Sequence, residues 1–253
     1  MIPVVLTTFR EAIRNRVLYL LLFFGVVIVL LSRIAGLLTV GDPMKVIQDL
    51  SLTVVTMIDI LLAVFVGIEL VYKEIERRTL FLILTKPITR NQFLFGKFIG
   101  LYGTILVVHV LMSGIMVAYI AALGHWNPRL FVALYTVMLE VLVVTGIATM
   151  FSTWTTPIIS GLFTLSVWVI GRGARSLLAL AEIVRKKSAA LAHVFEWLYY
   201  LLPDLGRLNL QTYAVHGTPL PQGYLVAVTL SAVLYTIVML ILASIIFNRR
   251  DFA

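Results

Sequence analysis

The chain has 253 residues, of which 61% are hydrophobic and only 13% are charged. A soluble domain is about 45–50% apolar and about 25% charged, so this composition excludes a water-soluble globule and indicates a membrane protein. The 20 Lys and Arg residues outnumber the 12 Asp and Glu residues, which gives a net charge of +8. These basic residues flank apolar runs, as cytoplasmic loops near anionic lipid do, so the charge does not indicate nucleic-acid binding.

The residues that carry catalysis or bind metals are sparse. Cysteine is absent, which excludes disulfides, thiolate catalysis and cysteine-ligated metals. Four scattered histidines lack metal-ligand spacing, so we expect no metal site. The sequence contains no G-x-x-x-x-G-K-[ST], H-E-x-x-H or G-x-S-x-G motif. Ser113 and His109 share one predicted helix, which disfavours an intramembrane serine protease. We therefore expect no catalytic residue and no bound cofactor in this chain.

Six apolar runs are long enough to cross a bilayer, which takes about 20 residues at a rise of about 1.5 Å each. The predicted spans are residues 17–40, 50–72, 98–123, 130–151, 152–171 and 224–247. The fifth run is the weakest, because it opens with several hydroxyl residues and Pro157. Lys and Arg counts favour a cytoplasmic N-terminus, and six spans then place both termini in the cytoplasm. We expect an all-α membrane protein with a single transmembrane domain over residues 1–253.

Residues 2–16 precede the first span. The spacing of Val5, Phe9 and Ile13 predicts an amphipathic helix that lies in the inner membrane interface, with Arg10 and Glu11 turned away. An N-terminal extension of the first span explains the same pattern equally well.

Residues 73–97 form the most informative connection. A charge cluster at 73–78 leads into an apolar piece at 79–84 that is too short to cross a membrane. Lys86 and Pro87 then break the helix, and Thr89 with Gln92 forms a capping-box pattern that starts the next helix. We therefore predict that residues 73–97 form a helical elbow on the cytoplasmic face. Its apolar centre and charged rim fit a docking surface, and they fit an amphipathic turn on lipid equally well.

Residues 172–223 are too polar for a span and too long for a hairpin. Residues 177–184 and 191–202 predict two helices that are separated by Arg185, Lys186 and Lys187. Pro and Gly residues make the remainder a loop. We expect two interfacial or partly re-entrant helices, because such a length without cysteine makes a marginal independent core.

Charged side chains inside spans are costly, so each is a functional candidate. Asp59 and Glu140 lie in the middle of predicted spans, Arg33 lies past the middle of the first span, and His109 lies in the third. These four residues could line a polar path or a subunit seam. Interhelical pairing, for example of a carboxylate with Arg33 or His109, is the simpler interpretation and the one that we favour.

The segment VGIELVYKEIERRTLFLILTKPITRNQFLFGKFIG (66–100) resembles the signature region of ABC transporter permeases of the type-2 exporter class. In that class a KE-x-E-x-RT helix end leads to a short coupling helix, a K-P turn and a G-K at the start of the third span. Further similarities are TFREAIRNRVLY (8–19), KVIQDLSL (45–52), LLPDLGRLNLQTYAVHG (201–217) and the ending IFNRRDFA. The nearest resemblance is to small six-span permeases grouped with multi-copper enzyme maturation systems.

This resemblance implies a permease that dimerises, as a homodimer rather than a heterodimer, and forms the pathway of an exporter. It implies two copies of a separate ABC ATPase subunit, which would hold ATP and Mg²⁺ in place of this chain. It also implies the bacterial cytoplasmic (inner) membrane, with lipid contact and room for a periplasmic accessory protein.

The resemblance further assigns residues 2–16 to an interface helix and residues 172–202 to outer re-entrant helices. The basic run Arg185-Lys186-Lys187 departs from that pattern, because it is unexpected on an outer face. The contact with the ATPase subunit falls on the coupling elbow, at Glu74, Glu76, Arg77, Arg78, Thr79, Leu80, Phe81, Leu82, Leu84, Thr85, Lys86 and Pro87.

Two other functions compete with the permease. A membrane anchor could use the same elbow to recruit an ATPase to a cell-envelope assembly without transporting a solute, and a dry seam between protomers would favour it. A secondary transporter or intramembrane enzyme would need repeated halves or a catalytic constellation, and the sequence shows neither. The few polar residues in the spans favour an amphipathic or lipid-like cargo over a strongly hydrated ion.

Overall fold

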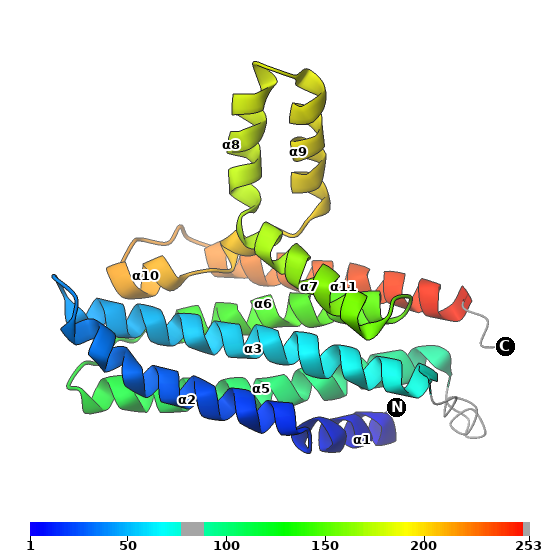
Figure 1. Ribbon diagram of the computed structural model, residues 1–253, viewed down its shortest axis with the longest axis horizontal. Coiled ribbons are helices and arrows are strands. Elements are labelled where there is room, and N and C mark those ends of the chain that lie inside the picture. Colours follow the sequence, from blue (N-terminus) through cyan, green and yellow to red (C-terminus); the bar gives the residue numbers. More distant parts are fainter. Residues whose placement is uncertain (77–88, 250–253) are drawn as a thin grey trace.

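The computed structural model describes residues 1–76 and 89–249, which form helices and loops without any β-strand. Most of the helices run lengthwise in one elongated bundle (Figure 1). The elements are α1 (Ile2–Ile13), α2 (Arg16–Leu37), α3 (Pro43–Glu76), α5 (Arg90–Ala122), α6 (Arg129–Ser152), α7 (Pro157–Arg172), α8 (Ala174–Arg185), α9 (Ala189–Leu201), η1 (Leu205–Arg207), α10 (Gln211–His216) and α11 (Tyr224–Arg249).

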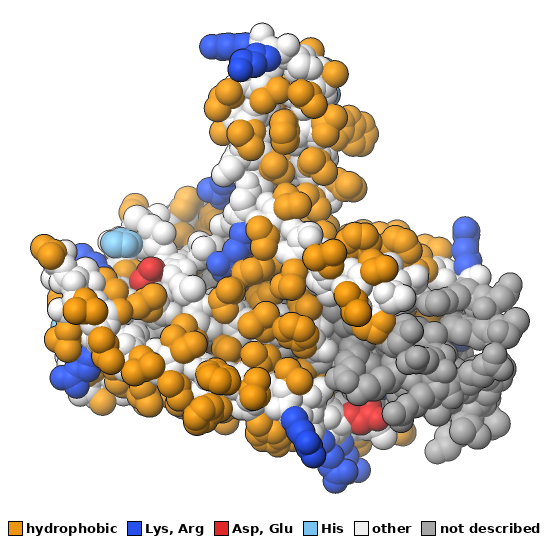
Figure 2. All heavy atoms as spheres, viewed as in Figure 1, with side chains coloured by type: hydrophobic (Ala, Val, Ile, Leu, Met, Phe, Trp, Pro, Cys, Tyr) orange, Lys and Arg blue, Asp and Glu red, His pale blue; other side chains and the backbone are white. Residues whose placement is uncertain are grey.

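The centre of the bundle is built by α3 and α6. Helix α3 packs against α2, α5, α6 and α7, and α6 packs against α3, α5, α7 and α11. Their contacts bury a continuous set of Leu, Ile, Val and Met side chains. The outer faces are apolar as well, so hydrophobic side chains cover most of the visible surface (Figure 2). Helices that are apolar on all sides belong in a lipid environment.

Five of the six predicted spans have matching helices. Among the described residues, the helices that are long and apolar enough to cross a membrane are α2, α3 over Pro43–Gly67, α5, α6 and α11. The predicted start of the helix that contains the third span is confirmed. The hydroxyl of Thr89 accepts from the N–H of Gln92, and the Gln92 side chain accepts from the N–H of Thr89, both at 3.3 Å.

The fifth predicted span, 152–171, is not one continuous crossing helix. Ser152 still belongs to α6, and the following threonines form a turn before α7 begins at Pro157. Proline fits the first helical turn and cannot continue a preceding helix, which sets this boundary. The 16 residues of α7 extend about 24 Å, less than the hydrocarbon core. A crossing is reached only if α7 and α8, bent by 70°, count as one broken span.

Residues 2–13 form a helix that is separate from the first span. The break falls at Arg14 and Asn15, and the Asn15 side chain accepts from the N–H of Val17 at 2.9 Å to start α2. The two helices are therefore not a single continuous rod. Helix α1 lies lengthwise against the beginning of α5 (Figure 1).

The predicted apolar face of α1 is shifted by one residue. The buried stripe is Val4, Thr8 and Ala12, while Val5, Phe9 and Ile13 are only partly buried at its flank. The reason is a close approach of the backbones. A Cβ added at Gly100 would lie 2.7 Å from the Thr8 Cβ and from the Val5 carbonyl oxygen. Small side chains must therefore occupy this contact.

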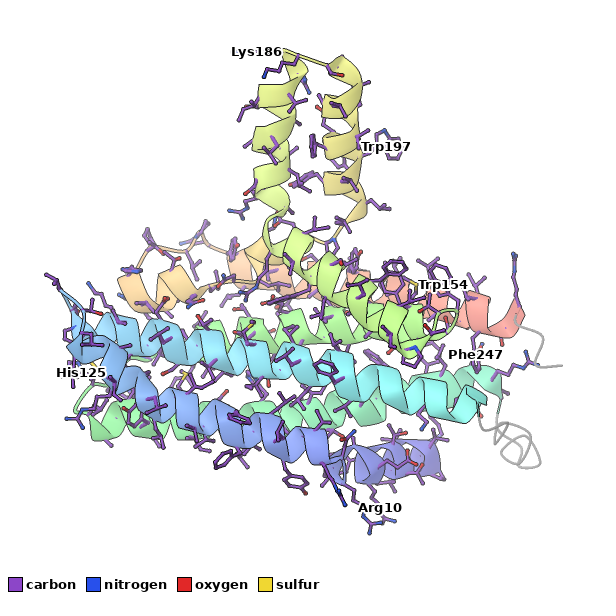
Figure 3. The ribbon with its side chains drawn as sticks, viewed as in Figure 1. Arg10, His125, Trp154, Lys186, Trp197 and Phe247 are labelled. Atoms are coloured by element: carbon purple, nitrogen blue, oxygen red, sulfur yellow. The ribbon has the colours of Figure 1, made fainter. Side chains whose placement is uncertain are left out.

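Helices α8 and α9 form an antiparallel hairpin that projects from the side of the bundle (Figure 1). This confirms the two predicted helices within 172–202. Lys186 lies at the tip, and Trp197 points away from α8 with 76% of its surface exposed (Figure 3). At the base, Asp204 pairs with Arg207 at 2.8 Å and with Arg175 at 3.8 Å.

Candidate functional site

The predicted coupling elbow joins the two longest helices. Helices α3 and α5 have 34 and 33 residues, or about 50 Å each, which exceeds the hydrocarbon core of about 30 Å. Glu74 and Glu76 lie in the last turn of α3. The other predicted contact residues, Arg77 to Pro87, lie outside the described residues.

The flanks of this connection lie at the same end of the bundle as the N-terminus and the end of α11 (Figure 1). The opposite end carries the α2–α3, α5–α6 and α10–α11 loops (Figure 1). An even number of membrane crossings places both termini of a chain on the same side, at one end of the bundle. The end of α3 and the start of α5 therefore lie at the same end of the bundle as α1 and the end of α11.

The first turns of α5 hold these neighbouring helices together. The Lys97 ammonium, with a side chain only 3% exposed, pairs with Glu11 of α1 at 3.5 Å. The Phe93 ring stacks on Phe247 of α11, with centroids 6.2 Å apart. The Asn91 side chain accepts from Ser244 at 2.9 Å and from Asn248 at 2.7 Å. Movement of the first turns of α5 would therefore be transmitted to α1 and α11.

The sequence analysis did not identify this junction. The signal was available in Gly96 and Gly100, two glycines four residues apart next to a lysine. Such spacing places small residues on one helix face, where a second helix can approach closely. An added Cβ at Gly96 would lie 3.0 Å from the Val4 Cβ, so both glycines face α1.

Asp59 on α3 pairs with His109 on α5, which is one of the two partners that the sequence suggested. The distance between the Asp59 Oδ2 and His109 Nδ1 atoms is 2.6 Å, and Asp59 is fully buried. On its other side, the His109 Nε2 atom lies 3.4 Å from the Ser113 hydroxyl. The second Asp59 oxygen, Oδ1, has no hydrogen-bond partner among the described residues.

Glu140 on α6 has different partners from those that the sequence suggested. It is fully buried and accepts from the Arg172 guanidinium at 2.8 and 3.0 Å and from the Trp168 indole N–H at 2.7 Å. The guanidinium also lies over the Trp168 ring, 5.2 Å from its centroid. Both donors come from α7, so Glu140 fixes the end of α7 at the point where the chain bends into α8.

Arg172 was predicted to lie in the connection 172–223, but it is the last residue of α7 and pairs with the buried Glu140. The available signal was the spacing of Trp168 and Arg172, four residues apart on one helical face. Arg33 joins neither buried pair. It is exposed near the end of α2, where its long side chain can reach the membrane interface.

The comparison with known families decides the identity. The model of the family described as ABC-2 family transporter protein matches residues 2–252, which is nearly the whole chain. The chain belongs to this family. No curated protein matches it at a significant level.

Family membership makes the protein a multi-pass membrane component of an ABC transporter, a permease that partners an ABC ATPase. Such a component contributes transport rather than catalysis. Both buried pairs of this permease join helices within one copy, α3 with α5 and α6 with α7. Neither Asp59 nor Glu140 is exposed on the surface of the single chain.

Proposed function

We propose that this permease forms the translocation pathway of an ATP-driven exporter as a homodimer in a bacterial inner membrane. Two copies of a separate ATPase subunit, which bind ATP and Mg²⁺, would supply the energy. The observation that carries the proposal is the family match together with the ends of the two long helices α3 and α5, which lie at the end of the bundle shared by the N-terminus and the end of α11.

The contacts in the first turns of α5 indicate how closure of the ATPase subunits would move the permease. When the ATPase subunits close on ATP, they would displace the elbow that joins α3 and α5. Helix α5 would carry α1 through Lys97 and Glu11, and α11 through Phe93 and Phe247. The equilibrium between two permease states shifts only as far as these states differ in their contacts with the ATPase.

Docking of the ATPase can be tested by co-purification from native membranes in mild detergent. The variant combines Arg77→Asp, Arg78→Asp and Leu82→Asp, which place unpaired charges at the predicted contact. The control is Lys45→Asp, a charge reversal at the opposite end of the bundle, on a side chain that is half exposed. We expect an ATPase with the wild type and with the control, and none with the elbow variant.

The same preparation tests the stoichiometry, because mass photometry of the purified complex should give two permease and two ATPase chains. The absence of any ATPase from the wild type would overturn the proposal. Since the chain contains no cysteine, a single cysteine introduced at Leu82 can then map the docking site by cross-linking.

A further inference from the structure

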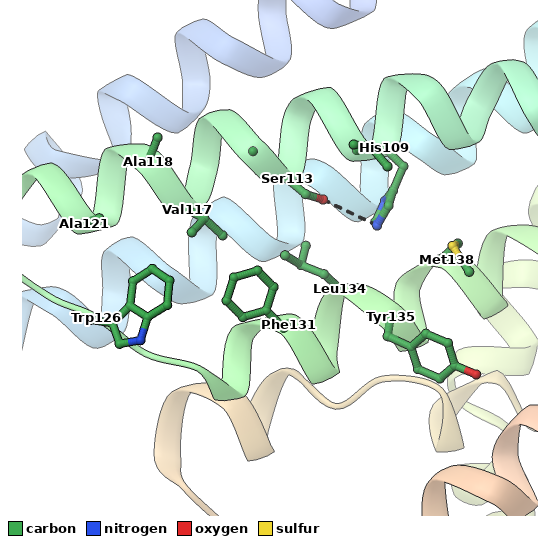
Figure 4. Close-up of a pocket in the computed structure, with 12 residues that line it drawn as sticks. His109, Ser113, Val117, Ala118, Ala121, Trp126, Phe131, Leu134, Tyr135 and Met138 are labelled. Carbon is green, nitrogen blue, oxygen red and sulfur yellow. Dashed lines mark hydrogen bonds between the residues drawn. The ribbon is translucent and has the colours of Figure 1, made fainter.

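A cavity of about 560 Å³ lies between α5 and α6, toward their joined ends (Figure 4). His109, Ser113 and Gly114 line one wall, while Phe131, Tyr135 and Met138 line the other. None of its twelve lining residues is Asp, Glu, Lys or Arg. The cavity is therefore an apolar space with a few polar atoms, which is the usual composition of a small-molecule site.

His109 and Ser113 supply polar atoms at one end of this cavity, and their side chains turn toward each other in Figure 4. Trp126 and Tyr135 also line the cavity, and the Tyr135 hydroxyl is hydrogen-bonded to Thr229 at 2.8 Å. With Asp59 ionised and His109 neutral, the carboxylate accepts from the His109 Nδ1–H group and the Nε2 atom is left as an acceptor. Ser113 is the neighbouring donor, but its oxygen lies 3.4 Å away, a long contact. The His109 Nε2 atom can therefore accept a shorter bond from a molecule in the cavity.

The rest of the cavity fits an apolar body. From His109 to Ala121 the α5 wall extends about 18 Å by helical rise. Trp126 and Phe131 close its far end, with ring centroids 5.8 Å apart. Gly114 adds width, because a Cβ at this position would meet nothing within 4 Å.

We infer that this cavity binds an uncharged amphiphile whose hydroxyl group donates to the His109 Nε2 atom and whose hydrocarbon body lies along α5 toward Trp126. A carboxylate head could not donate and would lie near the Asp59 carboxylate. An ammonium head would find no counter-charge among the lining residues and would lose its hydration. The inference is independent of the proposed export function, because binding is measured without the ATPase.

Binding can be measured by tryptophan quenching in nanodiscs with a twelve-carbon alcohol that carries bromine on its terminal carbon. With the hydroxyl at His109, the bromine lies near Trp126. Trp154 and Trp197 are exposed and do not line the cavity, so they report quenching by probe that has merely partitioned into lipid, whereas Trp126, which is 68% exposed, reports both kinds of quenching. We expect a saturable component that Trp126→Phe removes and unbrominated dodecanol competes away. The carboxylate, ammonium and alkane analogues should bind about fivefold to tenfold more weakly, as the loss of one hydrogen bond implies.

Two variants and one control test the location. Gly114→Leu fills the cavity without touching the buried pair and should abolish saturable quenching. Gly103→Leu is the matched control, since Gly103 lies on the same helix, also has open space at its Cβ and is not a lining residue. The double variant Asp59→Leu/His109→Phe removes both polar partners together, so no buried charge is left unpaired. It should retain binding but lose the preference for the alcohol.

Three results would overturn the inference. Equal binding of the alkane would make the cavity a groove for lipid tails. Equal binding of the carboxylate or ammonium analogue would exclude recognition by the His109 Nε2 atom. Quenching that survives Gly114→Leu as well as it survives Gly103→Leu would place the probe elsewhere.

Discussion

Asp59 and Glu140, which are both fully buried, are held in different ways. Glu140 uses both oxygens and receives three hydrogen bonds from Arg172 and Trp168. Asp59 uses one oxygen for His109 and leaves the other without a partner among the described residues. A fully satisfied buried polar network rigidifies the structure, whereas a buried oxygen without a partner costs free energy that a rearrangement could recover. The difference indicates that Glu140 fixes α7 against α6, which we call the clamp. The contact of Asp59 with His109 can rearrange more easily, and we call it the adjustable contact.

The strongest test of this difference is Glu140→Ala. It leaves the Arg172 guanidinium without its carboxylate at the bend between α7 and α8, and removal of one partner of a buried pair costs about 3–5 kcal/mol. We expect a loss of that size in SDS-induced unfolding in bicelles. Hydrogen exchange should rise over residues 157–172 first. The control Glu182→Ala, on the exposed face of α8, should change neither measurement.

Asp59→Asn should have a smaller effect than Glu140→Ala. The amide oxygen can still accept from His109, but the new N–H₂ group is buried without an evident acceptor, which costs about 1–3 kcal/mol. The same unfolding assay measures this loss. An effect larger than that of Glu140→Ala would reverse the assignment of clamp and adjustable contact.

Trp168→Phe removes one of the three donors to Glu140 and keeps the ring beneath Arg172. Since one net hydrogen bond is worth about 1 kcal/mol, we expect a loss of about that size. Tryptophan fluorescence of the folded variant should otherwise match the wild type after subtraction of one residue. No loss at all would mean that Arg172 alone satisfies the carboxylate.

Ser113→Ala should have the smallest effect, within about 0.5 kcal/mol in unfolding. Its hydroxyl makes only a long contact with His109. On the same helix, by contrast, the Thr104 hydroxyl donates to the Gly100 carbonyl oxygen at 2.9 Å. A large loss would show that Ser113 is part of the buried pair rather than of the cavity wall.

The sequence predicted most of the helices because their signals are local. Apolar run length located α2, α5, α6 and α11, and the Thr89 capping box depends on residues only three apart. The pairing of Glu140 with Arg172 depends on how α6 and α7 pack across 32 residues, so periodicity could not identify it. The start of the fifth predicted span was wrong for a local reason, because Pro157 begins a new helix and outweighs the hydropathy of the surrounding run.

His109 divides α5 into two arms of unequal length, an inner arm that begins at Arg90 and an outer arm that ends at Ala122. If the buried His109 contact acts as a pivot, the inner arm from Arg90 measures about 28 Å and the outer arm to Ala122 about 20 Å by helical rise. A displacement of about 3 Å at the inner end then swings the outer end about 2 Å the opposite way, if the helix stays rigid. The outer arm forms one wall of the cavity. A displacement of the inner end of α5 would therefore tilt this wall and widen or narrow the cavity.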